Sequence, residues 1–157
     1  MKPVKVFILA GQSNMEGKGK IDPLLNHQII APETKDFFAH LHKDGKYIER
    51  DDVWINYLER RGKLTVGYGS PGCIGLELEF GNIMGNHYDE PVLLIKTAWG
   101  GKTLVKDFRP PSSGGEVGPY YTEMLGHVRT VLADLGKLFP AYDGKGYEMA
   151  GFFWHIL

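Results

Sequence analysis

The sequence has almost no cysteine and no long hydrophobic run, and both absences narrow what the protein can be. Cys73 is the single cysteine among 157 residues, so no internal disulfide can form and no cysteine pair can bind zinc. No apolar run approaches the roughly 20 residues of a membrane-spanning helix. Met1-Lys2-Pro3 leads directly into a strand-like segment and is too short for the charged start of a signal peptide. We therefore expect a cytoplasmic protein, or a secreted or periplasmic one if a signal peptide has been removed.

An excess of charge of either sign is also absent. The formal net charge is −1, which gives no reason to expect nucleic acid or an anionic membrane as a partner. Apolar residues make up 43% of the chain and charged residues 24%, as in ordinary globular proteins. There are no repeats and no low-complexity linker, so we expect one domain over residues 1–157.

Strand-like and helix-like segments alternate along the chain. Apolar runs predict strands at residues 5–10, 63–69, 91–97 and 147–154, with Gly67 and Gly69 weakening the second of these. Apolar residues at helical spacing predict helices at residues 75–87 and 119–139. The unbroken run 91–97 suits a strand that is covered on both faces. This order predicts an α/β fold with three layers, α/β/α, around a mainly parallel sheet.

Residues 21–52 are polar and irregular, which indicates an insertion around a site. A short helix is expected at residues 33–42, and a small hairpin from residues 46–50 and 53–58. Residues 110–118 have the composition of a loop.

Three glycine-containing segments follow or precede these elements, at residues 11–15, 72–78 and 96–104. Ser13 comes directly after the first strand, where open α/β sheets place their chemistry. A nucleophilic serine needs donors about 3 Å from the developing oxyanion, and the backbone N–H groups of Ser13 and Gly75 are candidates. The alternatives are that Ser13 caps the following helix and that Gly75 only permits close packing.

The three segments resemble those of the SGNH-hydrolase superfamily. Gly11-Gln12-Ser13-Asn14-Met15, the later G-x-E-L-x-F-G pattern and the K-x-A-x-G-G pattern are similar to the sialate O-acetylesterase and acetylxylan esterase group of carbohydrate esterases. The resemblance runs from Val4 to Trp154. It implies a flavodoxin-like sheet of five parallel strands and a metal-independent esterase, without a cofactor, that removes acetyl groups from sugars. Ser13 matches the nucleophile and Gly75 the oxyanion-hole glycine.

Two departures from this family pattern concern the site. Many relatives have an asparagine as a donor in the third segment, where this chain has Gly100 and Gly101. The family's Asp-x-x-His pair has no matching positions, because the sequence stops at Leu157. We therefore expect a chain truncated at its C-terminal end. His155 is the one local candidate for a substitute base, although no carboxylate is obviously placed to orient it.

Several other residues have both a functional and a plain structural interpretation. Gln12 and Asn14 are expected to shape the substrate site by hydrogen bonding, or to serve as ordinary turn residues. Trp99 and its aromatic neighbours Phe108, Tyr120 and Tyr121 either stack on a sugar or only cover their loop. No histidine pair has the spacing of a metal site, and Gly100 to Thr103 lack the first glycine of a phosphate-binding loop.

The sequence thus predicts a serine-type esterase whose substrate is a small-molecule or polysaccharide acetyl ester of sialate or xylan type. The alternative is a catalytically impaired remnant that at most binds carbohydrate. With the base in doubt, weak activity is expected. A homo-oligomer is plausible, because Ala150, Phe152 and Trp154 are expected on an uncovered sheet face.

Overall fold

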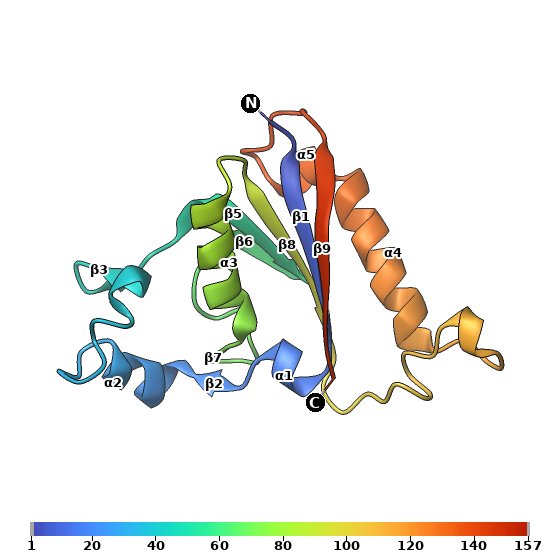
Figure 1. Ribbon diagram of the computed structural model, residues 1–157, viewed down its shortest axis with the longest axis horizontal. Helices are drawn as coiled ribbons and strands as arrows, with labels where there is room; N and C mark the ends of the chain where they lie inside the picture. Colours follow the sequence, from blue (N-terminus) through green and yellow to red (C-terminus); the bar gives the residue numbers. More distant parts are fainter. Residues whose placement is uncertain (1, 157) are drawn as a thin grey trace.

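A computed structural model describes residues 2–156 and shows a central sheet of five strands in the order β6-β5-β8-β1-β9 (Figure 1). These strands are β1 (Val4–Gly11), β5 (Arg50–Tyr57), β6 (Arg60–Leu64), β8 (Val92–Ala98) and β9 (Tyr147–His155). The strands β5, β8, β1 and β9 are parallel to one another. The prediction of a mainly parallel sheet is confirmed.

The edge strand β6 corrects the expectation of five parallel strands. It pairs antiparallel with β5, from which only Leu58 and Glu59 separate it. A link of two residues allows a hairpin but not a parallel crossover. Leu58 takes the left-handed conformation, with a φ of 52°, that such a tight turn requires.

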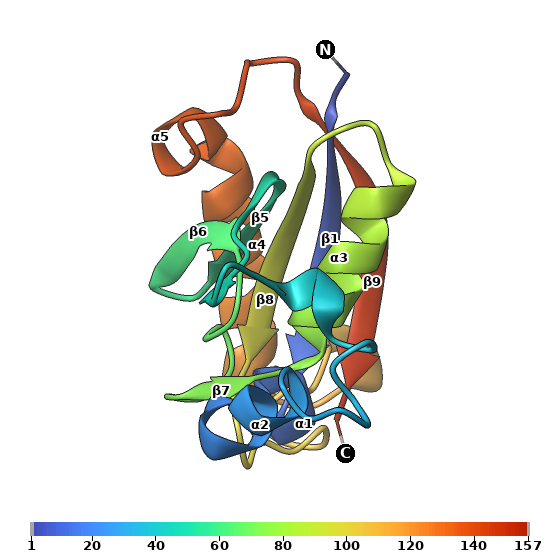
Figure 2. The same ribbon diagram turned by 90° about the vertical axis from the view of Figure 1, so that its left-hand side faces the viewer.

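Helices cover both faces of the sheet and complete the three layers (Figures 1 and 2). Helix α3 (Leu76–His87) lies on one face, and helices α4 (Pro119–Ala133) and α5 (Leu135–Leu138) lie on the other. Successive residues of β8 alternate between two cores: Leu94 packs in the cluster on the α3 side, while Leu93 and Ile95 pack with α4 and α5. The expected three-layer fold is therefore confirmed.

Short elements lie in the connections between the main strands and helices. They are α1 (Ser13–Glu16), β2 (Gly19–Lys20), η1 (Ile21–Leu25), α2 (Asn26–Gln28), η2 (Ala39–Leu41), β3 (His42–Lys43), β4 (Lys46–Tyr47), β7 (Cys73–Ile74) and η3 (Pro111–Ser113). Strands β2 and β7 form an antiparallel pair, with Gly19 opposite Ile74 and Lys20 opposite Cys73. This pair joins the segment after α1 to the segment before α3.

The structure differs from the sequence prediction in the insertion. Residues 33–38 form successive turns with mixed backbone bonds, such as Phe37 N–H to Thr34 C=O at 2.9 Å, so the helix expected at 33–42 is wrong. The hairpin expected from residues 46–50 and 53–58 is also wrong. Val53 and Ile55 are fully buried because β5 is an interior strand between β6 and β8.

Two further boundaries are corrected. The strand expected at residues 63–69 ends at Leu64, and the chain then turns through Gly67, whose φ is 97°. The helix expected at residues 119–139 breaks at Asp134, whose φ of −116° and ψ of 24° are not helical. The apolar spacing continues past that break because Leu135 and Phe139 still pack on the sheet.

In the sheet that residues 2–156 form, β9 is an edge strand. The exposed fraction is 53% for Phe152 and 42% for Phe153, although both flank the buried strand β1. The pairing of β9 with β1 shifts by one residue between Val6 and Phe7, so Ala150 of β9 is the extra residue of a bulge. The Ala150 side chain packs on the α3 side. Ala150 therefore does not share a face with Phe152 and Trp154, as the sequence had suggested.

Candidate active site

The carboxyl ends of three strands are fastened together around Gly11. Its C=O accepts from Trp99 N–H after β8 at 3.1 Å, and the next amide, Gln12 N–H, donates to His155 C=O of β9 at 3.0 Å. The Gln12 side chain donates to the C=O of Ile156. A Cβ on Gly11 would lie 1.8 Å from the His155 oxygen, so only glycine fits. The chain thereby delivers Ser13 to the point where β8, β1 and β9 end.

Ser13 is the first residue of helix α1 and is half-buried. Gln12 precedes it as the N-cap residue, and no side chain caps the helix, so the interpretation of Ser13 as a cap is wrong. Within residues 2–156, nothing forms a hydrogen bond with its hydroxyl. Asn14 is exposed. The geometry leaves the Ser13 hydroxyl available, and its role as the nucleophile stays a prediction.

Gly75 lies at the same edge of the sheet, against the segment that follows Ser13. A Cβ on Gly17 would lie 2.5 Å from the Cα of Gly75, and Gly17 N–H donates to Ser13 C=O at 3.0 Å. Gly75 is the N-cap residue of α3, and its N–H donates to Glu77 Oε1 at 2.8 Å. The amide expected to bind an oxyanion is therefore bonded to a carboxylate in this structure.

Glu77 and Lys96 form a fully buried ion pair behind this edge. Lys96 Nζ lies 2.7 Å from Glu77 Oε2, and both side chains have no exposed surface. Lys96 Nζ also donates to Glu16 C=O at 2.8 Å and to Tyr68 C=O at 2.7 Å, so its three donors are all used. Burial lowers the pKa of Lys96, and the nearby charge of Glu77 opposes this shift.

Tyr57 packs beside the ammonium group on the same side of the sheet. Lys96 Nζ lies 4.5 Å from the centre of the Tyr57 ring, and the Tyr57 hydroxyl donates to Ala98 C=O at 3.1 Å. Burial raises the pKa of this phenol far above its ordinary value. Tyr57 is therefore a neutral hydrogen-bond donor at the end of β8.

Glu16 places a second carboxylate at the site, which the sequence did not predict. Its Oε1 accepts from Ser70 Oγ at 2.5 Å and from Lys18 Nζ at 2.9 Å, and a Cβ on Gly100 would lie 2.7 Å from its Oε2. Burial acts to raise the pKa of Glu16, but these hydrogen bonds outweigh it and hold the pKa below its ordinary value. The Glu16 carboxylate thus packs against Gly100, as the Glu77 carboxylate packs against Gly75.

His155 is half-buried at the end of β9. Strand alternation places its side chain with that of Phe153, on the side that α3 covers. No side-chain hydrogen bond or ion pair of His155 occurs within the described part of the chain. Its role as a substitute base stays a prediction, and the structure supplies no carboxylate partner among these residues.

Two other histidines, His40 and His127, are engaged away from this edge of the sheet. His40 Nε2 lies 2.6 Å from Glu79 Oε2 on the surface, and His127 Nε2 lies 2.6 Å from Asn56 Oδ1 under the sheet. Burial lowers the pKa of His127. No three metal-binding side chains gather anywhere in residues 2–156, and no helix there is long and apolar enough to cross a membrane.

The aromatic residues near the third segment pack mainly on one another. The ring centres of Trp99 and Tyr120 are 5.0 Å apart, and those of Phe108 and Trp154 are 4.9 Å apart. Phe108 is only 2% exposed. These contacts favour a covering role for Phe108, while sugar stacking on the half-buried Trp99 stays a prediction. Gly101, with a φ of 72°, is exposed at the turn that follows.

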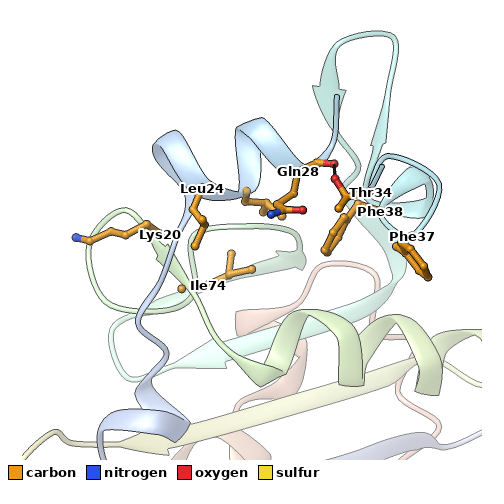
Figure 3. Close-up of a pocket in the computed structure, with 9 residues that line it drawn as sticks. Lys20, Leu24, Gln28, Thr34, Phe37, Phe38 and Ile74 are labelled. Atoms are coloured by element: carbon orange, nitrogen blue, oxygen red, sulfur yellow. Dashed lines mark hydrogen bonds between the residues drawn. The ribbon is translucent and has the colours of Figure 1, made fainter. Parts of the chain in front are cut away.

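An apolar pocket of about 590 Å³ lies beyond the β2–β7 pair (Figure 3). Its walls come from η1, α2, the turns at Phe37 and Phe38, and Ile74. The Thr34 hydroxyl closes one side by donating to Gln28 C=O at 2.8 Å. None of the expected site residues lines this pocket, although Ile74 directly precedes Gly75.

A parallel α/β sheet with a serine turn after its first strand, facing a glycine at the start of α3, defines an SGNH-type hydrolase fold. The chain belongs to the family described as carbohydrate esterase, sialic acid-specific acetylesterase, whose model matches residues 3–155. The family assignment that the sequence motifs suggested is therefore confirmed.

One solved structure shows the same fold at low sequence similarity. It is the X-ray structure, at 1.6 Å resolution, of a protein from Arabidopsis thaliana, with 16% identity and a TM-score of 0.57. The match covers 97% of the present chain and 56% of that chain, so the present chain spans little more than half the length of this relative. A comparison with curated proteins gives no significant match.

Proposed function

We propose that this chain carries the nucleophile of a serine-type carbohydrate esterase that removes O-acetyl groups from sugars of sialate or xylan type. The observation that carries the proposal is the placement of Ser13. Its half-buried hydroxyl, without a hydrogen-bond partner within residues 2–156, stands where β8, β1 and β9 end. Membership of the acetylesterase family supplies the reaction class.

In the proposed reaction, Ser13 Oγ attacks the acetyl carbonyl carbon and the sugar hydroxyl leaves. The resulting acetyl-serine is then hydrolysed by water, which releases acetate and restores Ser13. The Ser13 N–H is the donor closest in sequence for the oxyanion. Gly75 N–H contributes when the substrate oxygen takes the place of Glu77 Oε1, because one amide proton serves one strong acceptor at a time.

The proposed reaction also needs a proton acceptor for the Ser13 hydroxyl. A serine hydroxyl is a poor nucleophile at neutral pH without a base that a carboxylate orients. His155 lies at the same carboxyl edge of the sheet as Ser13. Its ring has no carboxylate partner in the part of the chain that the structure describes. We therefore expect the 157-residue chain to turn over acetyl esters slowly.

The test compares the turnover of 4-nitrophenyl acetate by the unmodified chain, Ser13→Ala and His155→Ala. Release of acetate from acetylated xylan and from O-acetylated sialic acid then distinguishes the two sugar classes. Activity that Ser13→Ala abolishes supports the proposal, and a further loss in His155→Ala assigns the base. Equal rates in all three proteins would leave the carbohydrate-binding remnant as the better interpretation, which sugar titration by calorimetry would then test.

A further inference from the structure

The buried ion pair between Lys96 and Glu77 differs from the other ion pairs in the described chain. Each of those has at least one partner with an exposed side chain, for example Lys63 with Asp51, which are 53% and 87% exposed. The Lys96 and Glu77 side chains are fully buried. A buried charged pair costs desolvation energy and adds little net stability, so its presence calls for another explanation.

The contacts of Lys96 supply that explanation. Its ammonium group holds Glu16 C=O, at the end of the helix that Ser13 begins, and Tyr68 C=O, in the loop before β7. The lysine itself stands on β8, the most buried strand of the sheet. A shift of the Ser13 helix away from β8 would leave a donor of a buried cation without a partner, which is strongly unfavourable.

Glu77 extends the same connection to Gly75. One carboxylate oxygen accepts from Lys96 at 2.7 Å, and the other accepts from Gly75 N–H at 2.8 Å. A Cβ on Gly75 would lie 2.5 Å from Glu77 Oε2 and 3.3 Å from Lys96 Nζ, so the glycine backbone packs directly against the ion pair. Helix α1, which begins at Ser13, and the Gly75 amide are thus both connected to the buried ammonium group of Lys96, the amide through Glu77.

We propose that Lys96 and Glu77 are positioning residues of the esterase site. Lys96 fixes the Ser13 helix against β8, and Glu77 holds the Gly75 amide in place in the free enzyme, until the substrate oxygen takes the position of its Oε1. Neither residue touches the reacting atoms; both act through the backbone groups they hold. This inference rests on the proposed function, and it adds a role to two residues of the glycine-containing segments that the proposed reaction itself does not use.

The experiment replaces the pair by apolar residues of similar size, Lys96→Met with Glu77→Leu, because such swaps commonly preserve folding. The matched control is Thr97→Val on the same strand. Thr97 is fully buried, points away from Lys96 by strand alternation, and has a hydroxyl with no partner in the described structure. Uniform ¹⁵N labelling then follows amide hydrogen exchange at Gly17, at Gly75 and at the other core amides, beside kcat and KM for 4-nitrophenyl acetate.

The double variant is expected to exchange Gly17 and Gly75 at least about tenfold faster while other core amides stay protected. Its kcat is expected to fall by about tenfold to a hundredfold, with KM changed by less than about twofold, because a displacement near 1 Å has effects of that size. Thr97→Val is expected to match the unmodified chain in both measurements.

Three results would overturn the inference: unchanged protection at Gly17 and Gly75, faster exchange spread evenly over the whole core, or an unchanged kcat in a variant whose unmodified parent is active. If the parent shows no turnover, the proposed function fails separately, and amide exchange alone decides on positioning. If the double variant does not fold, Glu77→Gln replaces it. The glutamine of that variant keeps the shape of Glu77, but it has one acceptor oxygen for two donors, Lys96 Nζ and Gly75 N–H. The same changes in amide exchange and kcat are therefore expected, with smaller magnitude.

Discussion

Strands β8 and β9 both flank β1 and are both rich in apolar residues, yet their surroundings are opposite. All seven residues of β8 are buried, including Lys96, whereas not one of the nine residues of β9 is fully buried. Strand β8 lies between two strands and two helical layers, while β9 has a neighbouring strand on one side only within residues 2–156. The position of a strand in the sheet, rather than its composition, decides how much of it is covered.

The same contrast holds for the charged residues on the two sides. Lys96 on β8 is held by three acceptors without contact with water, and Lys5 on β1 pairs with Glu148 on β9 at 2.5 Å at the surface. A pair in water is screened and free to exchange partners, so its contribution is small. The buried pair is the more fragile of the two, because the loss of either partner leaves a charge unpaired.

The largest effect is expected from Lys96→Met alone. It leaves the Glu77 carboxylate buried without its cation, so the free energy of unfolding should fall by about 3–5 kcal/mol. Urea denaturation followed by tryptophan fluorescence measures this change. The paired Lys96→Met and Glu77→Leu substitution should cost less than the single one, and a larger cost for the pair would contradict the contrast between buried and exposed charges.

A somewhat smaller effect is expected from removing an apolar side chain of β8. Leu94 is fully buried under α3, so Leu94→Ala should lower the free energy of unfolding by about 2–5 kcal/mol. Phe152→Ala on β9 is the comparison, and a change within about 0.5–1 kcal/mol is expected because that side chain is 53% exposed. Similar losses from both substitutions would show that β9 is covered in solution.

These contrasts also mark how much of the fold was accessible from the sequence. The sequence predicted strands β1, β8 and β9 and helix α3 nearly to the residue, because the apolar pattern of each fits only one type of element. Strand β5 was assigned to a small surface hairpin with residues 46–50, since Arg50, Asp51 and Asp52 make its first half resemble a surface segment. Only the tertiary position of Val53 and Ile55 between two strands identifies it as core.

For the site, the motif residues were predictable and their connections were not. Ser13 and Gly75 were found from their motifs and lie at the same edge of the sheet, while their catalytic roles stay predictions. Glu77 and Lys96 stand in those motifs too, but no local pattern links residues 19 positions apart in a buried pair. The carboxylate of Glu16 at Gly100 was missed for the same reason.

A smaller and pH-dependent effect is expected at His127. Burial lowers its pKa in the folded protein, so the unfolded chain binds more protons as the pH falls below the ordinary value of 6.5. The stability that His127 contributes is therefore present above pH 6.5 and is lost as the pH falls toward the lower folded value. His127→Gln should flatten the loss of stability on acidification from pH 7 to 5, measured by thermal unfolding, while an unaltered pH dependence would exclude this role.

The smallest change in folding stability is expected from Phe152→Lys, because its effect falls on association. The unpaired edge of β9 with its exposed aromatic residues favours pairing with a second copy, and an edge lysine opposes such pairing. Light scattering of the unmodified chain should show concentration-dependent dimers that Phe152→Lys removes. An unmodified chain that stays monomeric at all concentrations would contradict the expectation of a homo-oligomer.

The β2–β7 pair has one more consequence, through the single thiol of the chain. Cys73 is 2% exposed and lies in β7, directly opposite Lys20 and two residues before Gly75. A thiol reagent can reach Cys73 only when β2 and β7 separate. At low reagent concentration the labelling rate therefore reports the fraction of molecules in which β7, next to Gly75, is open. The reactivity of the Cys73 thiol is thus a built-in probe of local opening next to the candidate active site.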